Sequence, residues 1–594
     1  MIVVAQLLLV AAAVAKLAAA TAAAATNHDP DPCPPTSPKP NFIFIMTDDQ
    51  DLHLSSMDYM PAVDRHFTKE GTTFDKHYAT VSLCCPSRVT LLTGRAAHNT
   101  NVTDIKPPFG GYPQFIAEGW NDNYLPVWLQ AEGYNTYMAG KLMNGFSETN
   151  CNDPPPNGWT SRDLFIDPNT YTYYNASMQK DQGEVKFYPG EYSTDMVANK
   201  SIDFLDDAIH AGQPFFLAVT PIGPHSELVD DGFTHPLPAQ RHEHMYPGLK
   251  APRTSNFNPD VPSSGGWIKT LDPLNDTVID YMDDWYRNRI LALQSVDDLV
   301  DNILERLHKD PDVLDNTYLI YTSDNGYHIG QHRLAPGKTC AIEEDINIPF
   351  VIRGPGIEKG KRVSIPTTHT DIVPTLFQLA GIPLQDEFDG QPMPVTSDQL
   401  NELDNCSHKT EHIGVEYWGI GLLEGKYQGN GTLIDNGGGL FNTYKALRVI
   451  ADDYNIAYVV WCLNEHELYD MEADPGQMNN LYDTNGTINN WPVPKLTARI
   501  DALLLTLKAC KGRVCTHPWE TLHPQDDVHS LREAMNPKFD DFYTNELKVT
   551  YTACMKGYIP EFEGALYPIP YGESGNWSTG ARWRGNGNDL LDAR

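Results

Sequence analysis

Short, strongly apolar runs separated by helical segments are the feature that most limits the fold of this chain. The apolar runs lie at 41–46, 135–140, 214–222, 316–326 and 348–356, and we interpret each as a buried strand. Helical patterns lie between them at 125–134, 193–212 and 279–309, and the first two end in a Gly stop signal. Buried strands alternating with helices predict an α/β fold around a large, mostly parallel central sheet.

The pattern changes after about residue 395. Residues 385–405 have the composition of a linker, 444–470 read as successive antiparallel strands, and 493–510 as a helix. We therefore predict two domains, a main α/β domain at 41–395 and a smaller α+β domain with an antiparallel sheet at 396–594. A Pro-rich lead-in at 27–40 precedes them.

The N-terminus is typical of a secretory signal peptide. An apolar stretch runs into an Ala-rich segment with several A-x-A-like cleavage choices, which predicts removal of residues 1–26. Lys16 interrupts the stretch, and an uncleaved anchor is the alternative. No later segment holds about 18 uninterrupted apolar residues, so after cleavage we expect no membrane attachment.

The charge balance separates this chain from nucleic-acid-binding proteins. Lys and Arg number 43 against 78 Asp and Glu, which gives a formal net charge of −35. Such a surface repels nucleic acid and anionic membranes, and it suits a protein that stays soluble outside the cell. We expect secretion to the extracellular, cell-wall or periplasmic space, and a lysosomal or vacuolar location is the less favoured alternative. A site for an anion must then supply its own positive charge.

Sequons and cysteines also indicate secretion. N-x-S/T sequons, which predict glycosylation, begin at Asn101, Asn175, Asn199, Asn275, Asn405, Asn430, Asn485 and Asn576. The chain has 10 cysteines, and in an oxidising compartment most should pair. Cys510 and Cys515 are close enough in sequence for a small local loop.

Polar residues follow four of the predicted strands. Asp48 and Asp49 follow the first, Lys141 the second, His225 the third, and Asp324 with Asn325 the fourth. Ligands of open α/β sheets bind at the carboxyl ends of strands, so these groups should meet at one edge. Carboxylate and amide oxygens together predict a hard divalent cation, Ca²⁺ before Mg²⁺. The plainer alternative is that "DD" and "DN" are turn residues.

The stretch "VSLCCPSRVTLLTGR" at 81–95 holds two adjacent cysteines. Pro86 and Ser87 suit the first turn of a helix that begins at or just after Cys84 or Cys85. A helix N-terminus favours an oxyanion, and Arg88 adds a fixed charge one turn later. A vicinal disulfide, or two cysteines paired elsewhere, would explain the same residues without chemistry.

This motif resembles a known signature. C-x-P-S-R, four residues and T-G-R is the sulfatase signature, and Cys84 to Arg88 with Thr93 to Arg95 match its fixed positions. Further segments resemble family blocks in the expected order, among them "TDDQ", "SDNGYHIGQH", "PGKTCAIEEDINIPFVIRGPGI" and "HELYDMEADPGQMNNLYD", and the resemblance extends over about 41–484. It is greatest to the secreted arylsulfatases of fungi and algae, with N-acetylglucosamine-6-sulfatases as a neighbouring branch. It implies the alkaline-phosphatase-like sandwich fold with a smaller C-terminal sheet domain.

The resemblance also implies a chemistry. Cys84 would be oxidised to Cα-formylglycine by the formylglycine-generating enzyme in the secretory pathway. One hydroxyl of the aldehyde hydrate would attack a sulfate ester, and the other would let the bound sulfate leave. The implied metal ligands are Asp48, Asp49, Asp324, Asn325 and the modified Cys84. Arg88 would hold the formylglycine, while Lys141, His225 and Lys338 would bind the sulfate. His225 or Lys338 would protonate the leaving oxygen, and Asp324 would be the base.

Several alternatives stay open. Many arylsulfatases have a histidine two residues after the lysine, whereas this chain has Met143, so we expect its contact to be missing or supplied by Asn144. The same site could act on a sulfated sugar such as a 6-sulfated N-acetylglucosamine, or on a phosphonate or phosphate ester. An inactive relative that only binds ligands is a third hypothesis. If Cys84 is modified, nine cysteines remain, so at least one should be unpaired, and Cys85 is the first candidate.

Overall fold

The structure is a computed structural model, and it describes residues 39–572 apart from 231, 264, 405–409, 430 and 434–440. The predicted signal peptide, nearly all of the Pro-rich lead-in, and the sequons at Asn405, Asn430 and Asn576 lie outside these residues. Among the helices that are described, none has both the length and the apolar character that crossing a membrane requires.

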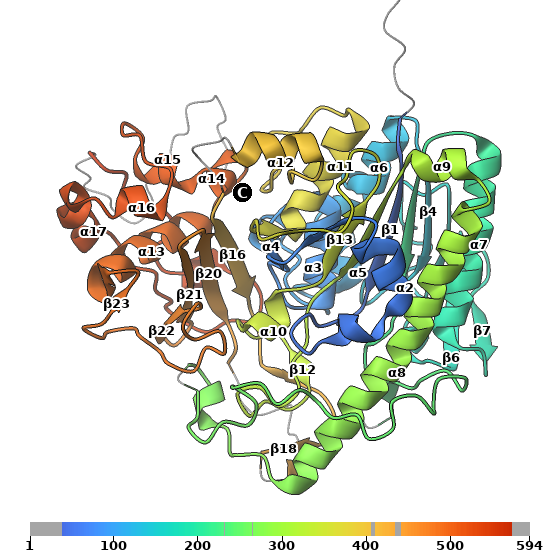
Figure 1. The fold of residues 1–594 in the computed structure, drawn as a ribbon, viewed down its shortest axis with the longest axis horizontal. Coiled ribbons are helices and arrows are strands. Elements are labelled where there is room, and N and C mark those ends of the chain that lie inside the picture. Colours follow the sequence, from blue (N-terminus) through green and yellow to red (C-terminus); the bar gives the residue numbers. More distant parts are fainter. Residues whose placement is uncertain are drawn as a thin grey trace, which may run out of the picture. The chain divides into compact units, whose positions relative to one another are not determined.

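A ten-stranded sheet forms the centre of the fold (Figure 1). Its middle is parallel, as predicted, and consists in order of β11 (Thr317–Ser323), β1 (Asn41–Thr47), β8 (Phe215–Thr220), β4 (Asn135–Gly140) and β5 (Ser161–Phe165). Strands in mixed pairings flank it. On one side β13 (Phe350–Arg353) is antiparallel to β11, β2 (Thr72–Phe74) is antiparallel to β13, and β14 (Lys361–Val363) is parallel to β2. On the other side β6 (Asn175–Lys180) and β7 (Lys186–Pro189) pair antiparallel.

Both faces of the sheet are covered, because side chains of a strand point alternately to either face. Ile43 and Ile45 of β1 pack in one core with the helices α7 (Ser193–Ala211) and α8 (Asp276–Leu307). Phe42, Phe44 and Met46 pack in a second core with α3 (Cys84–Thr93), α6 (Leu125–Ala131) and α11 (Ile372–Ala380). Figure 1 shows α7 and α8 side by side along the sheet. The result is the predicted helix–sheet–helix sandwich.

The C-terminal part contains the predicted antiparallel sheet. Its order is β16 (His412–Tyr417), β20 (Tyr444–Ala451), β21 (Tyr454–Trp461) and β22 (His466–Asp470). Helix α13 (Val493–Leu507) shares a third core with this sheet. The segment that we interpret as a linker carries α12 (Ser397–Asp404) and contributes Phe388, Met393 and Val395 to the core of the central sheet.

The cysteines divide into pairs and buried thiols. Cys510 and Cys515 form the local disulfide that their spacing predicts, and Cys462 pairs with Cys554. Cys84, Cys85, Cys151 and Cys340 are unpaired and buried. A vicinal disulfide between Cys84 and Cys85 is therefore absent from the structure. Cys33 and Cys406 lie outside the described residues.

Candidate active site

The polar residues that follow the four parallel strands meet at one edge of the sheet. Asp48 and Asp49 follow β1, Lys141 follows β4, and Asp324 with Asn325 follows β11, while His225 lies in the loop after β8. All six side chains are buried. This gathering confirms the geometric part of the sequence prediction, since the carboxyl ends of parallel strands share an edge.

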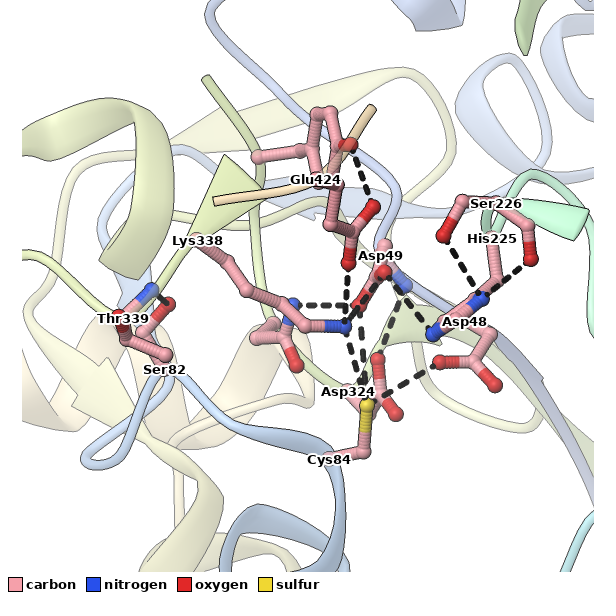
Figure 2. A network of polar contacts seen from close by, with 12 residues as sticks. Asp48, Asp49, Ser82, Cys84, His225, Ser226, Asp324, Lys338, Thr339 and Glu424 are labelled. Atoms are coloured by element: carbon pink, nitrogen blue, oxygen red, sulfur yellow. Dashed lines mark hydrogen bonds and ion pairs between the residues drawn. The ribbon is translucent and has the colours of Figure 1, made fainter. Parts of the chain in front are cut away.

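Cys84 is the first residue of helix α3 and faces this group (Figure 2). Its Sγ lies 3.5 Å from Oδ1 of Asp48 and 3.8 Å from Oδ1 of Asp49, and it accepts from Nζ of Lys338 at 3.2 Å. Burial raises the pKa of the Cys84 thiol well above its ordinary value, although Lys141 and Lys338 act in the opposite direction. Cys85 is buried among apolar side chains of the second core, which raises its pKa to about 12. The two adjacent cysteines thus have unlike surroundings.

The residues after Cys85 attach α3 to the turn after β11. Ser87 Oγ donates to the main-chain oxygen of Asp324 at 2.5 Å, and its other contact is Nδ1 of His369 at 2.9 Å. Arg88 Nε donates to Oδ2 of Asp324 at 2.8 Å, and its Nη1 donates to the carbonyl oxygen of Lys141 at 2.7 Å. These bonds fix Cys84 relative to two of the strand ends.

Three carboxylates at the strand ends are balanced by three cations. Lys141 Nζ lies 2.5 Å from Oδ2 of Asp48. Lys338 Nζ donates to both carboxylate oxygens of Asp49, at 2.5 and 2.6 Å, and Arg88 pairs with Asp324. Burial alone would raise the pKa of Asp48, but Lys141 and Arg88 lower it to about 2. Burial acts in the same way on Asp49, whose pKa Lys338 and His225 hold below its ordinary value.

The oxygen donors of Asp48, Asp49, Asp324 and Asn325 suit a hard divalent cation. Ligand atoms of Asp48, Asp49, Cys84 and His225 all lie within 4.8 Å of one another. Asp324 Oδ1 accepts from the main-chain N–H of Asp49 at 3.0 Å, next to this group. Oδ1 of Asn325 is buried and has no hydrogen-bond partner among the described residues. A buried acceptor without a partner is unfavourable, so the orphaned amide oxygen favours a cation there. The residues present fit Ca²⁺ or Mg²⁺.

His225 is held on one side by polar contacts and on the other by an aromatic ring. Its Nδ1 contacts the carbonyl oxygen of Ser226 at 2.8 Å, and its Nε2 lies 3.6 Å from Oδ2 of Asp49. The ring of Tyr171 stacks on the imidazole with centroids 4.1 Å apart, and Lys141 Nζ lies 4.7 Å from the centre of the same ring. Asn144 Nδ2 donates to the Tyr171 hydroxyl at 2.6 Å, so Asn144 reaches the site through that tyrosine. Sequence reasoning missed Tyr171.

Lys338 comes from β12 (Gly337–Lys338), which pairs with β17 (Leu422–Leu423). The residue after β17 is Glu424, whose Oε1 lies 4.0 Å from Nζ of Lys338. Its Oε2 accepts from the hydroxyl of Tyr327 at 2.7 Å. The C-terminal half of the chain therefore places a carboxylate beside this edge of the sheet. The sequence does not predict this position, because "LLEGK" carries no signal beyond that of a loop.

Comparison with known proteins identifies the family. The family model described as Sulfatase matches residues 40–382, more than half of the chain. The chain belongs to the sulfatase family. It is therefore a hydrolase of sulfuric esters, and the prediction of an enzyme of this class is confirmed.

Two curated relatives support the assignment. "Sulfatase ppz1" of Metarhizium majus is 52% identical over 410 residues, which cover 69% of this chain and 88% of the relative. The arylsulfatase of Volvox carteri is 35% identical over 552 residues, with coverage of 87% and 82%. The predicted likeness to fungal and algal sulfatases is thereby confirmed.

A solved structure in complex with D-glucosamine-2-N,6-O-disulfate has the same fold. It superposes with a TM-score of 0.59 at 22% identity and covers 75% of this chain and 94% of its own. At this identity the likeness supports the fold alone.

Proposed function

We propose that this sulfatase is a secreted arylsulfatase that uses a formylglycine made from Cys84 together with Ca²⁺. The observation that carries the proposal is the position of Cys84 at the start of α3. There its Sγ lies among Asp48, Asp49 and Lys338, on the edge where the donors of a hard cation gather. An unmodified thiol with a raised pKa is a poor nucleophile at neutral pH. A cysteine with a purely structural role would not need these polar neighbours. Both points favour a modified residue at position 84.

The side chains of the site divide into three tasks. The hydrate of a formylglycine at residue 84 would supply the nucleophilic oxygen, and a bound Ca²⁺ would supply positive charge that stabilises the charge developing in the reaction. Asp48, Asp49, Asp324 and Asn325 would hold the cation. Arg88 would orient residue 84 from the adjacent turn of α3. Lys141, Lys338 and His225 would bind the sulfate oxygens that the ester presents.

Proton transfer would involve two of these groups. Asp324 would accept the proton of the attacking hydroxyl, since its Oδ2 is directed by Arg88 at 2.8 Å. His225 or Lys338 would donate a proton to the leaving oxygen. Tyr171 stacks on His225 and therefore limits the orientations of the imidazole. Arg88 holds the Asp324 carboxylate in a fixed orientation and stays charged, because a guanidinium does not release its proton in proteins.

A sulfated sugar is the second candidate substrate. The N-acetylglucosamine-6-sulfatase of Homo sapiens, which is 30% identical to this chain over 502 residues, favours this candidate. A phosphonate or phosphate ester remains a third candidate for the same site. The overall identity to the Volvox arylsulfatase, which extends over most of both chains, is what favours an aryl ester.

Maturation would follow the secretory route. We propose cleavage of the signal peptide, oxidation of Cys84 by the formylglycine-generating enzyme, and glycosylation of sequons. Asn175, Asn199, Asn275 and Asn485 are exposed and Asn101 is partly exposed, so their side chains are accessible. The two disulfides suit an oxidising compartment.

Turnover of three esters tests the proposed function. The purified protein in Ca²⁺ should hydrolyse nitrophenyl sulfate faster than nitrophenyl phosphate and faster than 6-sulfated N-acetylglucosamine. The Cys84→Ala variant should keep the circular dichroism spectrum and lose activity by at least about 10³-fold. A preference for the sugar would replace the aryl substrate by the second candidate, and activity that survives in Cys84→Ala would exclude the nucleophile.

A further inference from the structure

Glu424 is a buried carboxylate that the proposed reaction does not use. Its side chain is 1% exposed. One oxygen accepts from Tyr327, whereas Oε1 has no hydrogen-bond partner among the described residues and lies 4.0 Å from Nζ of Lys338. The pairing of β12 with β17 fixes this approach, because Lys338 is opposite Leu422 and Glu424 follows directly after the pair.

A carboxylate at this place is unfavourable for an enzyme that binds anions. Lys338 already donates two hydrogen bonds to Asp49 and one to the sulfur of Cys84. A second carboxylate is not needed to keep Lys338 charged, and it repels any anion that binds next to that lysine. Glu424 is also outside the group of ligand atoms around Asp48 and Asp49. Its negative charge therefore needs another explanation.

The charge of the substrate offers an explanation for the carboxylate of Glu424. A sulfate monoester carries a single negative charge, whereas a phosphate monoester carries close to two above its second pKa of about 6. The two groups have the same tetrahedral shape and offer the same kind of oxygen acceptors to Lys141, Lys338 and His225. Hydrogen bonds alone therefore discriminate poorly between them, and the summed charge of the site is the property that can.

We propose that Glu424 is a specificity-determining residue that lowers the positive charge of the site and so favours monoanionic sulfate esters over dianionic phosphate esters. This inference rests on the proposed function, because it assumes that Lys338 binds the transferred group. Glu424 acts by its own charge, which repels the bound anion and offsets part of the positive charge that Lys338 presents. The repulsion grows with the charge of the ligand, so a dianion loses more binding free energy than a monoanion.

The expected effect is about tenfold. One unit charge within several ångströms of Lys338, in an interior of intermediate polarity, changes the relative binding of a dianion and a monoanion by roughly this factor, or about 1.4 kcal/mol. The Glu424→Gln and Glu424→Met variants remove the charge and keep nearly the same volume. We expect both to raise the ratio of kcat/KM for nitrophenyl phosphate to that for nitrophenyl sulfate by about tenfold at pH 8.

Binding measured without turnover separates this effect from catalysis. In a Cys84→Ala background with Ca²⁺, calorimetry should show that Glu424→Gln strengthens the binding of nitrophenyl phosphate about tenfold more than that of nitrophenyl sulfate. The matched control is Glu563→Gln. Glu563 is a buried glutamate whose Oε2 lies 3.5 Å from Nζ of Lys508 at the end of α13, and its change should leave the ratio as it was. Tyr327→Phe keeps the charge of Glu424 and should also leave the ratio unchanged.

The proposal would be overturned if Glu424→Gln raised the phosphate-to-sulfate ratio by less than threefold both in kcat/KM and in binding affinity. If neither neutral variant folds, Lys338→Met and the double variant Lys338→Met, Glu424→Met take their place. In the Cys84→Ala background the double variant should then bind nitrophenyl phosphate about tenfold more tightly than Lys338→Met alone, and equal affinities would overturn the proposal. An unmutated enzyme that prefers nitrophenyl phosphate would contradict the proposed function instead, which is a different outcome from an unchanged ratio.

Discussion

Lys141 and Asp48 form an ion pair that is fully buried, with Nζ 2.5 Å from Oδ2. The two residues come from the ends of β4 and β1, strands that are separated in the sheet by β8. A buried carboxylate is tolerated only with a compensating charge. In the proposed enzyme, Lys141 and Ca²⁺ both neutralise Asp48, so either of them should partly compensate for loss of the other.

Replacement of Lys141 by Met should destabilise the protein by about 3–5 kcal/mol when Ca²⁺ is removed with a chelator. Asp48 then loses its nearest cation and keeps only Arg88, whose Nη2 lies 3.5 Å from Oδ2. Ca²⁺ should restore most of this stability, since it binds the folded protein only. Thermal unfolding of both forms, with and without Ca²⁺, measures the difference. The control is Lys359→Met, which removes an exposed pair with Glu70 and should cost less than about 1 kcal/mol under either condition. Equal destabilisation of Lys141→Met with and without Ca²⁺ would contradict a cation site at Asp48.

The two adjacent cysteines should differ in chemical form. Trypsin cleavage after Lys76 and Arg88 releases residues 77–88, and mass spectrometry of this peptide should find an aldehyde at residue 84 and an intact thiol at Cys85. Cys85→Ala should keep the activity and lower stability by about 1–2 kcal/mol, because Cys85 packs in the apolar core. An unmodified Cys84 in active enzyme would rule out the formylglycine.

The two disulfides should contribute unequally to stability. Cys462 and Cys554 are 92 residues apart, whereas Cys510 and Cys515 are 5 apart. On the chain-entropy model, loss of the long loop costs about 4–5 kcal/mol and loss of the short one about 2 kcal/mol. Urea unfolding of Cys462→Ser, Cys554→Ser beside Cys510→Ser, Cys515→Ser measures both. The reverse order would show that native packing, and not loop closure, sets the stabilities.

Stability should fall as the pH rises through mildly acidic values. Burial raises the pKa of Glu411 from 4.5 to about 7, so between these values the folded chain keeps a proton that the unfolded chain releases. The stability that this proton gives is fully present below about pH 4.5 and is lost as the pH approaches 7, by up to about 3 kcal/mol. Glu411→Gln stays neutral at every pH, so its unfolding free energy relative to the parent should rise by that amount from pH 4.5 to 7.5. A difference that does not change with pH would show that Glu411 is ionised in the fold.

The sequence was sufficient to place the residues that directly follow strands of the central sheet. Asp48, Lys141 and Asp324 each follow an apolar strand, and parallel strands bring their carboxyl ends together. Cys84 was placed at a helix start by Pro86 and Ser87, and α3 begins there. The division at residue 395 stays a prediction, as do the catalytic roles of the individual residues.

Other parts of the site depend on contacts that sequence patterns do not encode. Glu424 reaches Lys338 through a two-residue strand pair between segments far apart in the chain. Three tyrosines lie at 171–174, and the sequence does not indicate which of their rings stacks on His225. It is Tyr171, the last residue of a single 3-10 turn at Asn169–Tyr171. Asn144, which we expected near the formylglycine, contacts Tyr171 instead. Periodicity predicts the face of an element, and these three residues lie in loops or at the ends of very short elements.

The burial of Cys84 has a consequence for how the protein is made. All ten residues of α3 are buried, so no enzyme can bind the cysteine and its neighbours once this helix has packed. On the proposed function, oxidation of Cys84 must therefore take place while residues 81–95 are still an extended, accessible segment. Each newly made chain then has a single interval in which it can become active, between entry into the secretory pathway and the closing of the core. A chain that folds first remains an intact but permanently inactive protein, and the active fraction of a preparation reports which of the two processes was faster.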